Sequence, residues 1–368
     1  MRFSLDILVI EKVEKLRYAS LLMMGISTSI IGILPPAASA GVGVVIVLQL
    51  MRLAQCFGRG GTWGGGILMA YENVPENKRS FYAAIPQIGL PIGFGLSSIL
   101  IAVPTLLLPE DIFFTWGWRI PFLAAIILTV IVIRQKGEMM ETEDYKKAQA
   151  KLEAEEAEGK KHKVGFIPMV KGYWKTLLLG CGTRWVDGTF YNIFIVWILS
   201  YCINWLGMPL IQTYIITIIA CIFKIPFTLF GGWCAQKLGN TRTFVIGALA
   251  SAVLSIPTLK VIELSKGNLA ITIIGIVLGW SIAYNLIWAV ISSLWSSYFE
   301  TEVRYSGISF VYHVPSFLVA GMVPTICTLL INYGKGDTIY VGIYSTVVAL
   351  ISAACALALK ARHDRGEK

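Results

Sequence analysis

Long apolar stretches alternate with short polar segments along most of the chain. Residues 18–38, 112–133, 243–261 and 339–359 each contain about 20 residues with few charges, which is enough for a helix to cross a bilayer. None of these stretches shows the two-residue alternation of a membrane β-strand, and a backbone in lipid must satisfy its own hydrogen bonds. The pattern therefore predicts membrane-spanning helices.

Extended over the whole sequence, the same pattern predicts about ten transmembrane helices. They are expected at residues 18–38, 43–71, 81–107, 115–134, 174–205, 211–236, 242–261, 269–297, 306–332 and 338–360. Several exceed the minimum span and are expected to tilt or to project from the membrane.

Composition supports a membrane protein over a soluble one. Hydrophobic residues make up 56% of the chain and charged residues only 14%, whereas a soluble domain carries about a quarter charged residues. The net charge of +9 is explained by basic cytoplasmic loops, so no nucleic-acid partner is expected. The partner expected from the apolar spans is the lipid bilayer.

One internal segment is strongly polar. Residues 135–173 carry alternating acidic and basic side chains, typical of a solvated and partly helical cytoplasmic linker. We therefore expect a bundle of about four spans over 1–134, this linker over 135–173, and a bundle of about six spans over 174–368.

The distribution of Lys and Arg predicts the orientation. With residues 1–17 inside, most basic residues outside the spans fall on cytoplasmic segments, and the outer loops hold Lys260, Lys266 and Lys335. This bias predicts a multi-pass protein of the cell membrane with both termini in the cytoplasm.

Ionisable side chains inside the second span are the first candidates for a functional site. Arg52, Gln55 and Arg59 follow one another at helical spacing and share one face. Charges inside a bilayer are costly and face the protein interior or a water-filled cavity. The alternative is a packing helix whose arginines bond to backbone carbonyls, since small-xxx-small pairs such as Gly60 and Gly64 favour close helix approach.

The fifth and sixth spans carry a second set. Arg184, Asp187 and Tyr191 share one helix face, and Asp187 is either the partner in a static ion pair or a proton-titrating group. Lys224, close before Pro226, is either a cation that faces a cavity or a side chain that snorkels to the membrane surface.

The balance of these groups indicates the substrate class. The deep cations outnumber the acid Asp187, and guanidinium groups bind carboxylates in a bidentate manner. These cations are Arg52, Arg59, Arg184 and Lys224. We expect substrate contacts from Arg52, Gln55, Arg59, Arg184, Tyr191 and Lys224, with proton coupling through Asp187. The expected partners are a small organic anion and protons.

The sequence predicts no enzyme, metal site or cofactor. The seven Cys stand singly in apolar stretches without metal-ligand spacing, and the three His lie far apart. No hydrolase, kinase or nucleotide-binding motif is present.

Three segments resemble the metabolite:proton symporters of the major facilitator superfamily. The second span resembles that group's fourth helix, 116–122 resembles its sixth-helix signature, and 303–307 resembles its loop between the tenth and eleventh helices. The matching residues of the second span and the loop after it are Arg52, Leu53, Ala54, Gln55, Gly60, Gly61, Thr62, Trp63, Gly64, Gly65, Glu72, Pro75 and Arg79.

The resemblance implies a fold of two helical bundles around a central cavity, alternating access, proton coupling and a monomer. It implies dicarboxylates, tricarboxylates, shikimate-like acids, or proline and betaines as substrates. It also implies gating roles for residues of the cytoplasmic loops, namely Glu72, Arg79, Lys237 and Arg304.

The sequence departs from this family at several points. By this alignment the family's first two helices are absent, Thr62 replaces a glutamate, and Gln236 replaces the aspartate of a gating loop. The leading hypothesis is a proton-coupled transporter of a small organic acid. The alternatives are a proline or betaine-type osmolyte carrier, an uncoupled uniporter, and a non-transporting truncated paralogue or membrane scaffold.

Overall fold

The structure, a computed structural model, describes residues 20–36, 40–60, 70, 74–134, 166–316 and 321–366. Within these ranges it is helical, with no strand. Of the expected span at 306–332, the structure describes α16 (Thr301–Pro315) with the following Ser316, and α17 (Val323–Tyr333), with Pro324 in its first turn, where the N–H that proline lacks is not needed. Residues 317–320 lie outside the described residues.

Six helical stretches are long and apolar enough to cross a membrane. They are Arg79–Leu107, Met169–Asn204, Leu210–Leu238, Asn240–Leu264, Leu269–Ser296 and Ile339–Asp364. Shorter apolar helices cover Ser20–Ile33, Val42–Gly58, Gly117–Ile131 and Val323–Tyr333. The all-helical membrane architecture expected from the sequence is confirmed.

The contacts within the chain define two units. The first comprises 1–66 and 99–140, and the second comprises 67–98 and 141–368. The helix α6 (Gly89–Leu107) passes from the second unit into the first. The division into 1–134, 135–173 and 174–368 stays a prediction, and most of the linker lies outside the described residues.

The first unit contains the Ser20–Ile33 helix and the end of α6, together with α3 (Val42–Gly60), α7 (Glu110–Thr115), the short turn η3 (Gly117–Arg119) and α8 (Ile120–Arg134). Its helices cross closely at glycines: a Cβ on Gly25 would meet Thr129, and a Cβ on Gly58 would meet the Ser20 carbonyl. Small residues at crossings are the usual means of packing helices in lipid.

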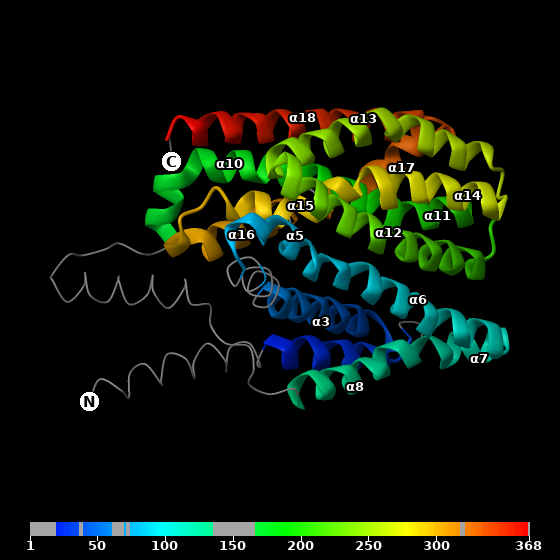
Figure 1. Cartoon of the computed structure of the whole chain (residues 1–368). Helices are drawn as coiled ribbons and strands as arrows, with labels where there is room; N and C mark the ends of the chain where they lie inside the picture. The colour runs from blue at the N-terminus through cyan, green and yellow to red at the C-terminus, as the bar shows by residue number, and fades with distance from the viewer. Residues whose placement is uncertain are drawn as a thin grey trace, which may run out of the picture. The chain divides into compact units, whose positions relative to one another are not determined.

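Among the described residues, the second unit opens with the short turn η1 (Glu76–Lys78), followed by α5 (Arg79–Ala84), the short turn η2 (Pro86–Ile88) and the start of α6. The remaining helices are α10 (Phe166–Tyr191), η4 (Asn192–Trp197), α11 (Ile198–Asn204), α12 (Leu210–Leu238), α13 (Asn240–Leu264), α14 (Leu269–Ile276), η5 (Val277–Ala283), α15 (Asn285–Ser296), α16 (Thr301–Pro315), α17 (Val323–Tyr333) and α18 (Ile339–Asp364). The helix α18 packs along α13 and α10, as Figure 1 shows, and α15 packs against α12 and α13.

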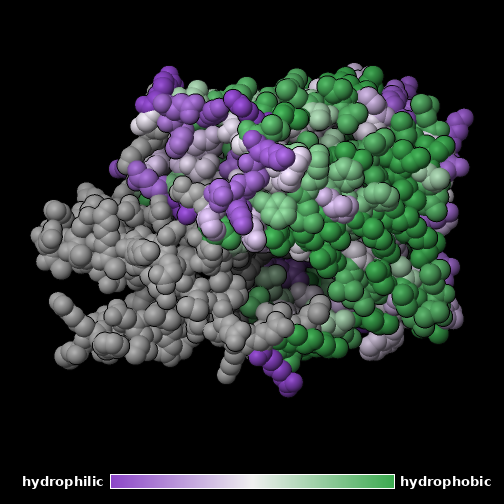
Figure 2. All heavy atoms as spheres, in the orientation of Figure 1, coloured by the Kyte–Doolittle hydropathy of each residue, from purple (hydrophilic) through white to green (hydrophobic). Residues whose placement is uncertain are grey.

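The surface of the second unit is divided by polarity. Figure 2 shows apolar side chains over its flank and hydrophilic side chains gathered at the end where α18 finishes. The exposed large hydrophobic residues of its helices include Ile222 of α12, Val253 of α13 and Leu350 of α18. An apolar flank with a polar end fits a surface that contacts lipid acyl chains.

At the far end of α13, an ion-pair cluster joins that helix to the start of α18. The Lys260 ammonium binds Asp337 Oδ1 at 2.7 Å and Glu263 Oε1 at 3.0 Å. Glu263 Oε2 accepts hydrogen bonds from the amide and hydroxyl of Thr338 at 2.8 and 2.7 Å. The hydrogen bond from Lys260, together with that from the Ile339 amide, lowers the pKa of Asp337 below its ordinary value.

Candidate functional site

The centre of the second unit contains a charged pair on α10. Arg184 and Asp187 lie one helical turn apart, and their side chains are 8% and 2% exposed. The Arg184 guanidinium forms an ion pair with Asp187 Oδ2. A buried pair of this kind is stable only when further polar contacts compensate for lost hydration.

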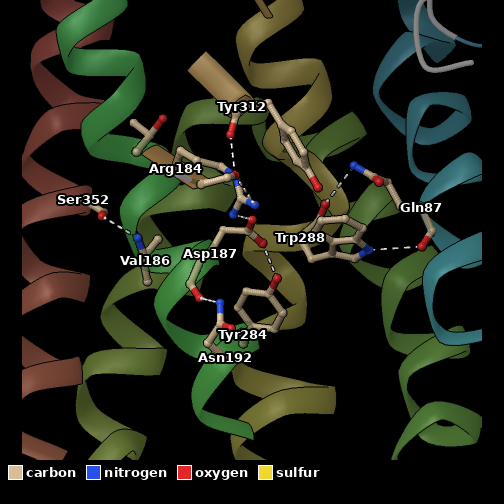
Figure 3. A network of polar contacts seen from close by, with 12 residues as sticks. Gln87, Arg184, Val186, Asp187, Asn192, Tyr284, Trp288, Tyr312 and Ser352 are labelled. Atoms are coloured by element: carbon tan, nitrogen blue, oxygen red, sulfur yellow. Dashed lines mark hydrogen bonds and ion pairs between the residues drawn. The ribbon is translucent and has the colours of Figure 1, made fainter. Parts of the chain in front are cut away.

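Side chains from two other helices supply those contacts (Figure 3). The Tyr284 hydroxyl, at the start of α15, donates a hydrogen bond to Asp187 Oδ1. Arg184 Nη2 donates to Ser316 Oγ at 3.3 Å, and the Arg184 guanidinium lies 4.4 Å from the centre of the Tyr312 ring. The pair is therefore held from both sides.

Lys224 of α12 lies on the other side of Tyr284. Its side chain is fully buried, and Nζ lies 4.4 Å from the ring centres of both Trp280 and Tyr284. The polar contact of Nζ is with the Trp280 carbonyl oxygen at 3.5 Å. Tyr284 thus contacts Lys224 with its ring and Asp187 with its hydroxyl, which links the two groups.

Two buried donors in this region have no acceptor. Arg184 Nε and Trp280 Nε1 are inaccessible to solvent and have no hydrogen-bond partner in the structure. A buried unpaired donor costs about 1–3 kcal/mol. Such groups in a native protein are expected to meet a ligand or an ordered water at some stage.

Ser352 of α18 forms hydrogen bonds with the backbone around the charged pair. Its hydroxyl donates to the Gly182 carbonyl at 2.7 Å and accepts from the Val186 amide at 3.1 Å. In a regular α-helix these two backbone groups bond directly to each other. The Ser352 hydroxyl thus lies beside the turn that carries Arg184. The two helices are close here, because a Cβ on Gly182 of α10 would clash with Cys355 of α18.

Two wide π-helical segments flank the site. The segment η4 follows Tyr191, and η5 contains Trp280 and precedes Tyr284. They meet where the Phe194 ring packs on Gly279, which has no room for a Cβ. π-Helical turns are rare and are frequently found at functional sites.

Three of the four substrate and proton-coupling residues predicted in the second unit lie close together, and the fourth, Tyr191, lies one turn further along α10. Arg184, Asp187 and Lys224 join through Tyr284, as described above. Tyr191 is half-buried one turn after Asp187, and its ring makes an edge contact with Phe94 of α6, with centres 5.7 Å apart.

The predicted residues of the first unit form a separate group on α3. Arg52 is exposed, and Gln55 is half-buried with its Nε2 donating to Thr28 Oγ1 at 2.7 Å. Arg59 lies in α3, but its side chain is outside the described residues. Their role in substrate binding stays a prediction.

Three of the four predicted gating residues lie among the described residues, each on a different helix. Arg79 begins α5 and is half-buried, Lys237 places Nζ 4.3 Å from the centre of the Trp233 ring, and Arg304 Nε donates to the Phe299 carbonyl at 3.2 Å. Glu72 lies outside the described residues. Their gating role stays a prediction.

Sequence reasoning did not identify Trp280, Tyr284, Trp288 or Ser352. The three aromatic residues are spaced four apart in the predicted span 269–297, so they lie on one face of a helix. Each carries an N–H or O–H group, and this pattern could have been detected in the sequence. Ser352 gave no such signal, because a serine in an apolar helix is common in membrane proteins.

A helical membrane protein with a buried ion pair and a buried lysine, held between helices by aromatic side chains, is typical of a solute transporter. A profile of the Major Facilitator Superfamily matches residues 13–324. The chain belongs to this superfamily. It is a multi-pass transporter of the cell membrane and not an enzyme.

Relatives among characterised transporters narrow the class to carriers of metabolites or osmolytes. The inner membrane metabolite transport protein YhjE of Escherichia coli is 32% identical over 353 residues, covering 94% of this chain and 77% of the relative. The shikimate transporter of Escherichia coli is 30% identical, covering 92% and 76%. The proline/betaine transporter of Salmonella typhimurium is 27% identical, covering 96% and 70%.

Solved structures share the fold. The D-xylose-proton symporter matches with a TM-score of 0.66 at 16% identity, covering 93% of this chain and 80% of that one. The fucose:proton symporter FucP of E. coli matches with a TM-score of 0.59 at 11% identity, covering 94% and 84%. At these identities the likeness concerns the fold alone.

Proposed function

We propose that the chain carries a small organic acid across the cell membrane and that uptake is coupled to protons. The observation that carries this proposal is the excess of buried donors in the second unit. Arg184 Nε and Trp280 Nε1 lack acceptors, and Lys224 forms no ion pair with a carboxylate of the described residues. The carboxylate of a solute would satisfy these donors and balance the positive charge.

Asp187 provides the link to protons. When its carboxylate is charged, it neutralises Arg184, and the pair has little attraction for an anion. When Asp187 is protonated, the charge of Arg184 is released and can bind the carboxylate of a solute. Proton and anion then bind together, which is the requirement for symport.

Arg52, Gln55 and Arg59 are proposed to contribute solute contacts from the first unit. Glu72, Arg79, Lys237 and Arg304 are proposed to act in gating. The support for both sets is the resemblance of their sequence segments to the metabolite:proton symporters. A monomer with both termini in the cytoplasm completes the proposal.

A carrier of zwitterionic osmolytes is the second candidate, because the relatives include proline/betaine transporters. The same arginine, Arg184, could bind an osmolyte, since proline and betaine also carry a carboxylate. An uncoupled uniporter is favoured over both if the Arg184–Asp187 pair stays closed throughout transport.

Uptake into proteoliposomes tests the proposal. Labelled shikimate and succinate are offered with and without an inward proton gradient, beside labelled proline and glycine betaine. We expect accumulation of an acid only with the gradient. Accumulation of an osmolyte but no acid would overturn the substrate class, and equal acid uptake with and without the gradient would overturn the coupling.

The variant Asp187→Asn separates coupling from binding. Because Asn cannot be protonated or charged, we expect solute exchange across the membrane to continue while accumulation driven by the gradient is lost. Glu263→Gln is the matched control, since it neutralises an acid outside the proposed site. Gradient-driven accumulation by Asp187→Asn equal to that of the wild type would exclude Asp187 as the proton carrier.

A further inference from the structure

The environment of Lys224 resembles a binding site for a cation, already filled. Nζ is equidistant from the centres of the Trp280 and Tyr284 rings, at 4.4 Å, and the side chain has no exposed surface. Both distances are well inside the range of a cation–π interaction, which strengthens when water is excluded. Two aromatic faces around one cation are also how proteins bind quaternary ammonium groups.

The two rings are fixed independently of Lys224. The Tyr284 hydroxyl is bound to Asp187, and the Tyr284 ring stacks on Phe190 with an interplanar angle of 8°. Trp280 is fully buried within η5. Because other contacts hold the rings, their position is expected to persist when the lysine side chain is shortened.

The conventional explanation for a buried lysine is an acid beside it. Among the described residues, no carboxylate forms an ion pair with Lys224. The Lys224 ammonium donates a hydrogen bond to the backbone carbonyl of Trp280 at 3.5 Å, which is long for a charged hydrogen bond. The rings are therefore the principal partners of the charge.

We propose that Lys224 is a resident cation that occupies a Trp280–Tyr284 aromatic site and thereby excludes quaternary ammonium solutes from the second unit. The inference rests on the proposed function, because it identifies a class of solute that the proposed transport site excludes. An onium head group is kept out by the volume of the lysine side chain and by repulsion from its charge. An anion meets no such barrier and gains a positive partner.

The variant Lys224→Ala removes the cation and leaves the rings. We expect purified Lys224→Ala to bind choline at least about tenfold more tightly than the wild type, as measured by equilibrium dialysis with labelled choline. The neutral isostere 3,3-dimethyl-1-butanol, which has the same shape without the charge, is expected to show no such gain. Lys224→Arg keeps the charge and the volume and should bind choline no better than the wild type.

A double variant locates the gain. Lys224→Ala combined with Trp280→Leu removes one wall of the site, and we expect the gained choline affinity to disappear. Lys224→Ser opens the same space and provides a second test if the alanine variant does not elute as a single folded species. No gain of choline affinity in the folded variant, or an equal gain for the neutral isostere, would overturn the inference.

The result can be separated from the proposed function. Choline binding is measured on purified protein without transport, so it is informative even when the wild type carries no organic acid. Conversely, acid uptake by the wild type could be found together with no gain of choline affinity in Lys224→Ala. That result would support the proposed function and would contradict the proposal that Lys224 is a resident cation.

Discussion

The indole Nε1 of Trp288 on α15 donates a hydrogen bond to the backbone carbonyl of Gln87 at 3.1 Å. Pro91 stands four residues after Gln87, at the position whose N–H would bond the Gln87 carbonyl in a regular α-helix, and proline has no N–H. Gln87 Nε2 in turn reaches the Trp288 carbonyl at 3.5 Å, and Figure 3 shows the two residues facing each other. A side chain from α15 therefore supports the interruption between α5 and α6.

Trp288→Phe tests this support. The variant keeps an aromatic side chain but removes the donor, so the Gln87 carbonyl loses a buried hydrogen bond worth about 1–3 kcal/mol. We expect a lower melting temperature of the purified protein in detergent. Trp174→Phe, at an exposed position on α10, is the control and should melt like the wild type. Equal melting of both variants would show that the indole donor is not needed.

Ser352→Ala tests the hydroxyl inserted beside the charged pair. Without it, the Val186 amide and the Gly182 carbonyl lose their hydrogen bonds to α18 beside the turn that carries Arg184. We expect a small loss of thermal stability, about 1 kcal/mol, together with a change in the half-saturating concentration of the transported acid. Ser352→Thr retains a hydroxyl and should restore the half-saturating concentration. A change in stability alone would limit Ser352 to packing.

Gln236→Glu tests the contact between α12 and the start of α5. Gln236 Oε1 accepts from the Phe81 amide at 3.3 Å, in the first turn of α5. A glutamate of the same length keeps the acceptor and adds a negative charge at a helix start, which is favourable by about 0.3–1 kcal/mol. We expect a raised melting temperature that declines as salt is added. Gln236→Leu removes the acceptor and should lower the melting temperature. A higher melting temperature with leucine would contradict a stabilising role of the Gln236–Phe81 hydrogen bond.

The cluster around Lys260 predicts an acid-sensitive contribution to stability. The folded protein holds the pKa of Asp337 below its ordinary value of 3.8, so the stabilising charge is present at neutral pH and is lost as pH falls below that value. Thermal melts from pH 6 down to about pH 3 should therefore decline less steeply for Asp337→Asn than for the wild type. Asp111→Asn, an exposed acid on α7, should follow the wild type. Parallel curves for all three proteins would remove Asp337 as a contributor.

The spans were predictable from sequence because hydrophobic length is a strong local signal. The helix predicted at 211–236 is α12, and the one predicted at 242–261 lies within α13. The grouping of Arg184 with Asp187 followed from helical spacing. By contrast, Lys224 and Tyr284 come from different helices, and their contact depends on how α12 and α15 pack, which spacing along the chain does not contain.

The end of α16 and the start of α17 within the predicted span 306–332 were also visible only in part. Pro315 and Pro324 each indicate a possible interruption, yet prolines are tolerated within membrane helices, as Pro226 and Pro257 are within α12 and α13. Which proline divides a helix is decided by neighbouring residues that can satisfy the released backbone groups. That information lies in the tertiary contacts.

The contact between Phe194 and Gly279 joins two segments whose backbones are wound more loosely than an α-helix. Loosely wound turns can tighten only if the residues beyond them rotate about the helix axis. Since the ring of one segment fills the space left by the missing side chain of the other, neither can rewind without displacing its neighbour. Rotation of Trp280 and rearrangement beyond Tyr191 are thereby mechanically coupled, although the two residues belong to helices distant in the sequence.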